Sequence, residues 1–164
     1  LRKLLSPHPS KPLGPGSQAP DFEAKNQEGK LVRLSEFKGT YLLIYFYPFD
    51  DTPGCTKEAC DFRDRYSELR KLNAKVLGVS RQNAKSHKKF QQKHKLPFDL
   101  LVDEKGELAE QFGIGLLPIF GLHSRQSVLI NPEGKVVRFY EEVDPRAHVE
   151  EVLRDIHSAS SQGL

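Results

Sequence analysis

The two cysteines, Cys55 and Cys60, are the residues whose type and spacing could do chemistry. Cys55 ends the segment Thr-Pro-Gly-Cys, in which Thr52 suits a helix N-cap and Pro53 suits the first helical position. A helix that begins there makes Cys55 its third residue. At that position the helix dipole favours a thiolate, and the Thr52 hydroxyl can accept a hydrogen bond from the Cys55 N–H. Because Gly54 also lets another group approach closely, the turn suits a nucleophilic cysteine.

Cys60 follows five residues later, and this spacing limits when the two sulfurs can meet. In an intact helix, five residues correspond to about 140° of rotation and about 7.5 Å of rise, so the Cα atoms lie roughly 8–9 Å apart. A disulfide requires about 4.4–6.8 Å between Cα atoms. The two thiols can therefore pair only if the first helical turns unwind. We predict a bond that forms and breaks as residues 55–62 unfold locally.

Other interpretations of the cysteines remain open on these grounds. Two cysteines are often inert apolar residues, and the chain would then be a redox-inert binding domain. A thiol–disulfide oxidoreductase normally carries C-x-x-C, which is absent here, and Pro118 lies well before the strand expected at residues 127–130. A metal site is disfavoured because C-x4-C has no second pair and no nearby histidine. His87 and His94 fall among lysines, which is typical of a solvated helix face.

Strand and helix patterns alternate along the chain and indicate how Cys55 is positioned. We expect two short strands around a turn at residues 27–29, then strands at 41–47, 74–80 and 99–102, and a hairpin around 131–134. We expect helices at 52–72, 83–95, 107–112 and 145–157. This order predicts an α/β fold, a central mixed sheet flanked by helices with an N-terminal β-hairpin. Strands 41–47 and 74–80 should be parallel neighbours, and a ligand should bind beyond the first of them, at 48–55.

The overall composition is that of one globular domain. Of 164 residues, 37% are hydrophobic and 29% charged, the net charge is +3, and no apolar run reaches the roughly 20 residues of a membrane helix. We therefore expect neither a membrane nor a nucleic-acid partner. We assign residues 1–16, which contain four prolines, to a flexible arm, 17–157 to the domain and 158–164 to a disordered tail. The chain contains no methionine, so we expect that its initiator was lost by processing or left out by design.

The residues around Cys55 resemble the active-site motif of peroxiredoxins. Pro48, Thr52 and Cys55 form P-x-x-x-T-x-x-C, and TPGCTKEAC is similar to the bacterioferritin comigratory protein/peroxiredoxin Q subfamily. The resemblance extends over about residues 16–156. It includes the segments GSQAPDF, SHKKF, LPFDLLVDEKGELAEQFG and SRQSVLINPEGKV.

This resemblance implies a thioredoxin-like fold and a thiol-dependent peroxidase of the atypical 2-Cys type, acting on hydrogen peroxide and organic hydroperoxides. Cys55 would be the peroxidatic cysteine, and its sulfenic acid would be resolved by Cys60. Thr52 would hold the peroxide and the thiolate, and Pro48 would shield the sulfur from water. Arg125 matches the arginine of the family's active site.

The resemblance also suggests supporting groups, a reductant and a setting. The Gly54 N–H would contact the substrate, and Arg63 is a weaker candidate for a supporting role. No metal, haem or flavin is needed, and thioredoxin or a similar dithiol would reduce the disulfide. The subfamily implies a monomer, in a bacterial cytoplasm or, alternatively, as an organelle-processed form such as a plastid one. The apolar loop at residues 114–124 could either wall the substrate site or pack as core.

Overall fold

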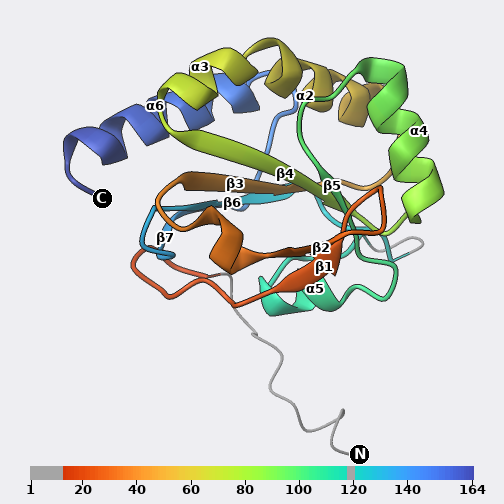
Figure 1. Cartoon of the computed structure of the whole chain (residues 1–164), viewed down its shortest axis with the longest axis horizontal. Helices are drawn as coiled ribbons and strands as arrows, with labels where there is room; N and C mark the ends of the chain where they lie inside the picture. Colours follow the sequence, from red (N-terminus) through yellow and green to blue (C-terminus); the bar gives the residue numbers. More distant parts are fainter. Residues whose placement is uncertain (1–12, 118–120) are drawn as a thin grey trace, which may run out of the picture.

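A computed structural model describes residues 13–117 and 121–164 and contains a central five-stranded mixed sheet (Figure 1). The strands lie in the order β5-β4-β3-β6-β7. Their bounds are β3 (Tyr41–Phe46), β4 (Ala74–Ser80), β5 (Leu100–Val102), β6 (Gln126–Ile130) and β7 (Val136–Tyr140). Strands β3, β4 and β5 are parallel, and β6 is antiparallel to both β3 and β7. The α/β class and the parallel β3–β4 pair are confirmed.

Every residue of strand β3 is buried, and its side chains contribute to the apolar clusters on both faces of the sheet. Successive side chains of a strand point to opposite faces. Leu43 and Tyr45 therefore pack into one apolar cluster, and Leu42, Ile44 and Phe46 pack into the other. A strand that serves two faces must be apolar throughout, which is the pattern from which it was predicted.

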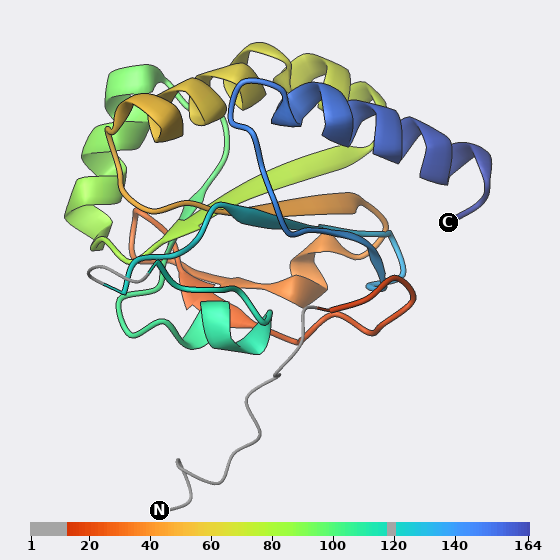
Figure 2. The same ribbon diagram turned by 180° about the vertical axis from the view of Figure 1, so that it is seen from behind.

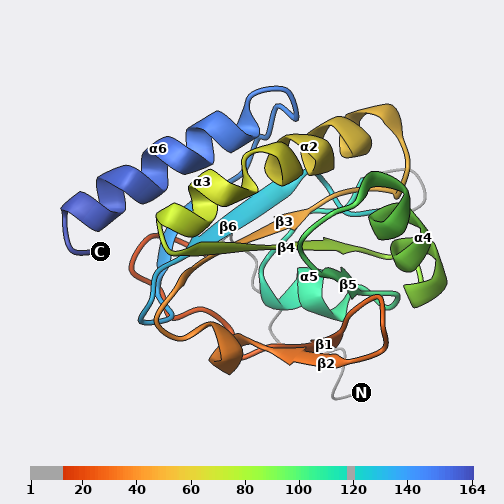
Figure 3. The ribbon, with the colours of Figure 1, turned by 45° about the horizontal axis from the view of Figure 1, so that its top comes forward.

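The two faces of the sheet carry different elements (Figures 1 and 2). One face is covered by α2 (Pro53–Asp64), α3 (Tyr66–Lys71), α4 (Ala84–His94) and α6 (His148–Ser161). The other is covered by the antiparallel hairpin of β1 (Glu23–Lys25) and β2 (Leu31–Arg33), by the short 3-10 helix η1 (Leu34–Phe37) and by α5 (Glu107–Gln111). Figure 3 shows α2 lying over the carboxyl end of β3. The predicted N-terminal hairpin is confirmed.

The helix expected at residues 52–72 is two helices, so that prediction was wrong in its extent. The break falls at Arg65, whose φ and ψ of −105° and 10° lie outside the helical region. The Arg65 guanidinium pairs there with Glu68 of α3 and Glu150 of α6. Apolar residues at helical spacing continue on both sides of Arg65, so the periodicity alone carries no sign of the break.

The two ends of the domain also differ from the prediction. Helix α6 begins at His148, not near residue 145, and continues to Ser161 through much of the expected disordered tail. The Leu164 N–H still donates to the Ala159 carbonyl at 2.9 Å. Of the predicted arm, residues 1–12 lie outside the described residues, while the Gly16 N–H donates to the Val136 carbonyl of β7 at 2.8 Å. In the described part of the chain no helix has the length and apolar character needed to cross a membrane.

Helix α4 is basic and largely exposed, as expected, with one exception that corrects the prediction. Asn83 caps the helix by accepting a hydrogen bond from the Ser86 N–H. His87, which we placed on the solvated face, is fully buried. Its neighbour on the same face, His94, remains partly accessible and contacts Asp51. The two ends of this face therefore lie in different surroundings.

Candidate active site

Cys55 lies where the sequence predicts, as the third residue of α2. Residues 48–52, here called the 48–52 loop, lead from β3 to α2. The last of them, Thr52, has an extended backbone, and the helix begins at Pro53. Cys55 is only 1% exposed and belongs to the apolar cluster beneath α2. The thiol is thus held at the positive end of a helix and largely shielded from water.

The side chain of Thr52 does not make the expected cap. Its hydroxyl donates to the Phe49 carbonyl at 3.1 Å instead of accepting a hydrogen bond from the Cys55 N–H. The Thr52 carbonyl does accept the first helical hydrogen bond, from the Thr56 N–H at 2.8 Å. Pro48 lies at the start of the same loop, where its carbonyl accepts a long, 3.5 Å hydrogen bond from the Gln82 amide.

Arg125 lies beside the thiol, with Nη2 3.3 Å from the Cys55 sulfur. The sheet explains this contact between residues that are far apart in the chain. Because β6 is antiparallel to β3 and Gln126 pairs with Phe46, the residue before β6 lies at the edge where β3 ends. Gly54 makes room for the guanidinium, since a Cβ at Gly54 would lie 3.1 Å from Nη2. The expected use of Gly54 for close approach is confirmed.

Glu58 is a site residue that the sequence analysis did not identify. It lies three residues after Cys55 on the same helix, is fully buried, and accepts a hydrogen bond from Arg125 Nη1 at 2.9 Å. Burial raises the pKa of Glu58 to about 7, although the Arg125 charge opposes the rise. Its other oxygen, Oε2, has no hydrogen-bond partner among the described residues. The signal available in the sequence was an acidic residue at i+3 from Cys55, which shares its helix face.

Cys60 is half-buried in the second half of the same helix, and both cysteines are free thiols. Burial raises the pKa of the Cys60 thiol, with neighbouring charges making smaller contributions of both signs. Arg63 does not join the site. Its guanidinium donates to the His94 carbonyl at 2.8 Å and pairs with Asp64, so it ties α2 to α4.

The apolar loop at residues 114–124 is described only in part. Pro118, Ile119 and Phe120 lie outside the described residues. Leu116 and Leu117 are 54% and 37% exposed, so these two side chains do not pack as core.

The arrangement around Cys55 suits a nucleophilic sulfur. A guanidinium within hydrogen-bond distance and a helix N-terminus both place positive charge beside the sulfur. The same guanidinium could also stabilise negative charge that develops on an atom bonded to the sulfur. In the described part of the chain, no group of three or more histidine, cysteine or acidic side chains is placed to hold a metal ion.

Comparisons with known proteins point in one direction. Residues 15–139 match the AhpC/TSA family. Peroxiredoxin Bcp of Bacillus subtilis is 43% identical over 152 residues, which cover 90% of this chain and 97% of that protein. The chloroplastic peroxiredoxin Q of Oryza sativa subsp. japonica is 43% identical over 145 residues, 87% of this chain and 66% of that protein. A structure of the Xanthomonas campestris bacterioferritin comigratory protein, described in connection with alkyl peroxide reduction, has 35% identity and a TM-score of 0.78, covering 84% of this chain and 90% of that one.

Proposed function

Because this chain belongs to the AhpC/TSA family and is a thiol-dependent peroxidase, we propose that Cys55 is its peroxidatic cysteine and Cys60 its resolving cysteine. Its mixed sheet with flanking helices is the thioredoxin-like fold of peroxiredoxins. One observation carries the assignment of Cys55, namely the Arg125 guanidinium 3.3 Å from its sulfur at the start of α2. Cys60 has no comparable cation contact among the hydrogen bonds and ion pairs of the described residues.

In the first step the Cys55 thiolate attacks the terminal oxygen of a hydroperoxide. A sulfur–oxygen bond forms as the oxygen–oxygen bond breaks, and the leaving oxygen departs as water or an alcohol after it takes up a proton. Arg125, the Thr52 hydroxyl and the N–H groups of Gly54 and Cys55 would stabilise the charge on the two oxygens. For this, the Thr52 hydroxyl must turn away from the Phe49 carbonyl. Cys55 is left as a sulfenic acid.

In the second step the first turns of α2 unwind, and the Cys60 thiolate attacks the sulfenic sulfur. A disulfide forms between Cys55 and Cys60 while the sulfenic oxygen leaves as water. The unwinding is required because a wound helix holds the two Cα atoms about 8–9 Å apart, beyond the reach of a disulfide. A dithiol then reduces the bond by thiol–disulfide exchange.

Two residues would support the first step without reacting. Glu58 would hold the Arg125 guanidinium in place through the 2.9 Å hydrogen bond from Nη1, which leaves Nη2 directed at the sulfur. Pro48, at the start of the 48–52 loop, would limit the access of water to the sulfur. Both roles are part of the proposal.

We assign thioredoxin as the dithiol reductant, a monomer as the working form and the bacterial cytoplasm as the compartment, with a plastid as the alternative. The named relatives support both compartments, since one is from a bacterium and another is chloroplastic. Hydrogen peroxide and organic hydroperoxides are the proposed substrates, and the structure described for alkyl peroxide reduction supports the second of these.

The decisive experiment follows NADPH consumption when the purified protein is given hydrogen peroxide, thioredoxin and thioredoxin reductase. The wild-type chain should consume NADPH, and Cys55→Ser should abolish the turnover completely. If Cys55→Ser consumed peroxide at the wild-type rate, the assignment of Cys55 would be wrong. Replacing thioredoxin by a different dithiol protein in a parallel reaction tests the reductant separately from the peroxidase.

A further inference from the structure

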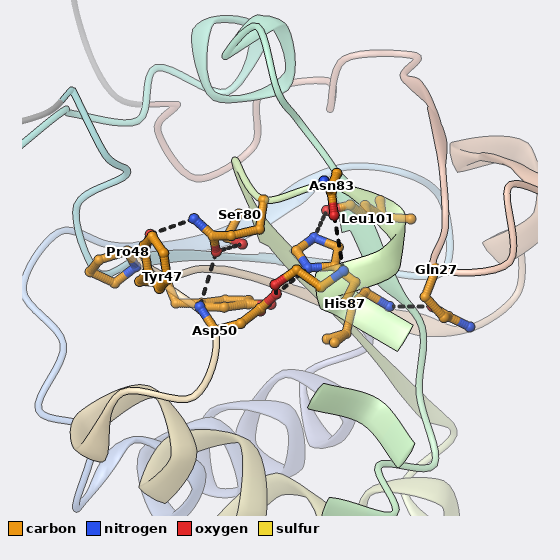
Figure 4. Close-up of polar contacts among 12 residues, drawn as sticks. Gln27, Tyr47, Pro48, Asp50, Ser80, Asn83, His87 and Leu101 are labelled. Atoms are coloured by element: carbon orange, nitrogen blue, oxygen red, sulfur yellow. Dashed lines mark hydrogen bonds and ion pairs between the residues drawn. The ribbon is translucent and has the colours of Figure 1, made fainter. Parts of the chain in front are cut away.

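His87 of α4 is a buried, titratable residue that the proposed mechanism does not use. Both of its ring nitrogens lie within hydrogen-bond distance of oxygens, Nε2 2.8 Å from the Leu101 carbonyl and Nδ1 2.7 Å from Asp50 Oδ2 (Figure 4). The side chains of His87 and Asp50 are 0% and 4% exposed. A histidine placed between two oxygens in the interior must satisfy both of them.

The surrounding hydrogen bonds make His87 and Asp50 one connected group. The Leu101 carbonyl can only accept, so Nε2 carries a hydrogen. Asp50 also accepts from the Tyr47 hydroxyl at 2.6 Å and from the Ser86 hydroxyl at 2.8 Å. His87 therefore joins the Asp50 carboxyl group to the Leu101 carbonyl of β5.

This pair is joined directly to the loop that leads to Cys55. Asp50 belongs to the 48–52 loop, and its N–H donates to Gln82 Oε1 at 3.0 Å. The Ser80 hydroxyl donates to the same oxygen at 2.7 Å, and the Gln82 amide reaches the Pro48 carbonyl (Figure 4). The loop is thus fixed by Ser80 at the end of β4, by Gln82 two residues later and by side chains of α4. Among these contacts, His87 supplies the fully buried one to Asp50.

We propose that His87 is a positioning residue of the peroxidase. It holds Asp50, and through Asp50 the 48–52 loop, so that Pro48 and Thr52 stay in place around Cys55 when the peroxide is attacked. The proposal rests on the proposed function, because it assigns these two residues the roles given above. A displacement of about 1 Å in such supporting groups can cost up to about a hundredfold in rate, which makes the loop's anchor worth testing.

Two substitutions separate this role from simple filling of the core. In His87→Asn the side-chain amide nitrogen takes the place of Nδ1 and can still donate to Asp50. In His87→Gln the amide nitrogen takes the place of Nε2, so it can reach the Leu101 carbonyl but not Asp50. Both variants lose the ring, and only one of them keeps the contact with the loop.

The experiment measures the second-order rate constant for oxidation of Cys55 by hydrogen peroxide, by rapid quenching and mass spectrometry, together with the thermal unfolding midpoint. We expect His87→Gln to be slowed about tenfold or more and His87→Asn to stay within about threefold of wild type, although both lose stability. Lys89→Gln, an exposed change on the same helix, is the control and should match wild type. Equal rates for the Asn and Gln variants, or a wild-type rate for His87→Gln, would overturn the proposal.

A second measurement uses the wild-type protein, so its outcome does not depend on whether a variant folds. In a ¹⁵N-labelled wild-type protein, nuclear magnetic resonance should show the His87 ring hydrogen-bonded through both nitrogens, with one proton held between Nδ1 and Asp50. A ring with no such proton at Nδ1 would overturn the inference. Failure of the proposed function would be seen separately, as peroxide turnover by Cys55→Ser, whereas failure here leaves wild-type peroxidase activity intact.

Discussion

The two cysteines of α2 are five residues apart, yet they lie in different chemical surroundings. Cys55 is 1% exposed at the helix N-terminus with the Arg125 guanidinium 3.3 Å from its sulfur. Cys60 is half-buried in the second half of the helix, and burial raises the pKa of its thiol. The helix N-terminus and the guanidinium therefore suit Cys55 to the proposed attack, whereas burial favours the thiol form of Cys60. With the roles proposed above, the order of the two chemical steps would follow from the position of each cysteine along the helix.

After Cys55→Ser, the largest effect on activity is expected from replacing the second cysteine. Cys60→Ser should still be oxidised once at Cys55 at close to the wild-type rate, because the surroundings of Cys55 are unchanged. Cycling with thioredoxin should stop, since no resolving thiol remains. The first reaction can be measured by trapping the sulfenic acid and counting adducts by mass spectrometry, and the second by NADPH consumption. Normal cycling by Cys60→Ser would remove Cys60 from the mechanism.

Removing the cation should make Cys55 more like Cys60. Arg125→Ala is expected to lower the second-order rate constant with peroxide by about 10²–10³-fold, roughly 3–4 kcal/mol of barrier, as for loss of one donor to a developing oxyanion. Arg63→Ala is the matched control, because Arg63 contacts the His94 carbonyl and Asp64 and not the Cys55 sulfur. An unaltered rate for Arg125→Ala, measured by competition with a second peroxidase, would show that the guanidinium does not act on the reaction.

A smaller effect concerns the carboxyl group that holds Arg125. Because the pKa of Glu58 is raised from 4.5 to about 7, the folded chain binds its proton more tightly than the unfolded chain does. The free energy of unfolding should therefore decrease as pH rises from about 4.5 to about 7, by about 2–3 kcal/mol from this group. Glu58→Gln cannot ionise and still offers an oxygen to Arg125, so this decrease should disappear.

Urea unfolding of wild type and Glu58→Gln at a series of pH values from 4.5 to 8 measures that difference. Asp64→Asn is a suitable control, since Asp64 lies on the same helix and pairs with Arg63 at the surface. It should follow the wild-type pH dependence closely. If Glu58→Gln also kept the wild-type slope, Glu58 would not be the titrating group.

The last prediction concerns amide exchange in helix α2 alone. When Cys55 and Cys60 are joined, the amide groups of residues 55–62 should lose protection against hydrogen exchange, because a wound helix cannot hold the disulfide. Amides of the buried strand β3 provide the internal reference and should stay protected in both forms. Equal protection of residues 55–62 in the reduced and oxidised chain would contradict the proposed unwinding.

The sequence was sufficient for the parts of the site that depend on local structure. Thr52 and Pro53 mark the start of α2, and Cys55 follows at the third position. The contact between Cys55 and Arg125 could be expected only from the family resemblance, since it depends on the antiparallel pairing of β3 with β6 across a long stretch of chain. Glu58 could not be recognised before Arg125 was known to lie beside it. A local pattern does not report which groups a sheet brings together.

The errors in the sequence analysis have the same origin. Hydrophobic spacing runs without interruption through Arg65, whose non-helical backbone lies beside its ion pairs with Glu68 and Glu150. His87 lies among lysines, and its contacts with Asp50 and Leu101 come from other elements of the fold. In both cases the residue contacts a charged group from a distant element, which a local pattern does not reveal.

The aromatic packing under Phe62 has a consequence for how the enzyme meets its reductant. The Phe62 ring stacks on Tyr45 at 5.1 Å and lies edge-on to His148 at 5.8 Å, so this side chain anchors the end of the segment that is expected to unwind and the residues of α2 after it can stay in place. Once the disulfide is broken, the attached end offers a template on which the frayed turns can rewind. In the proposed cycle, a reductant that binds the unwound segment would lose that binding site when the helix re-forms, so refolding of this segment would favour release of the oxidised partner.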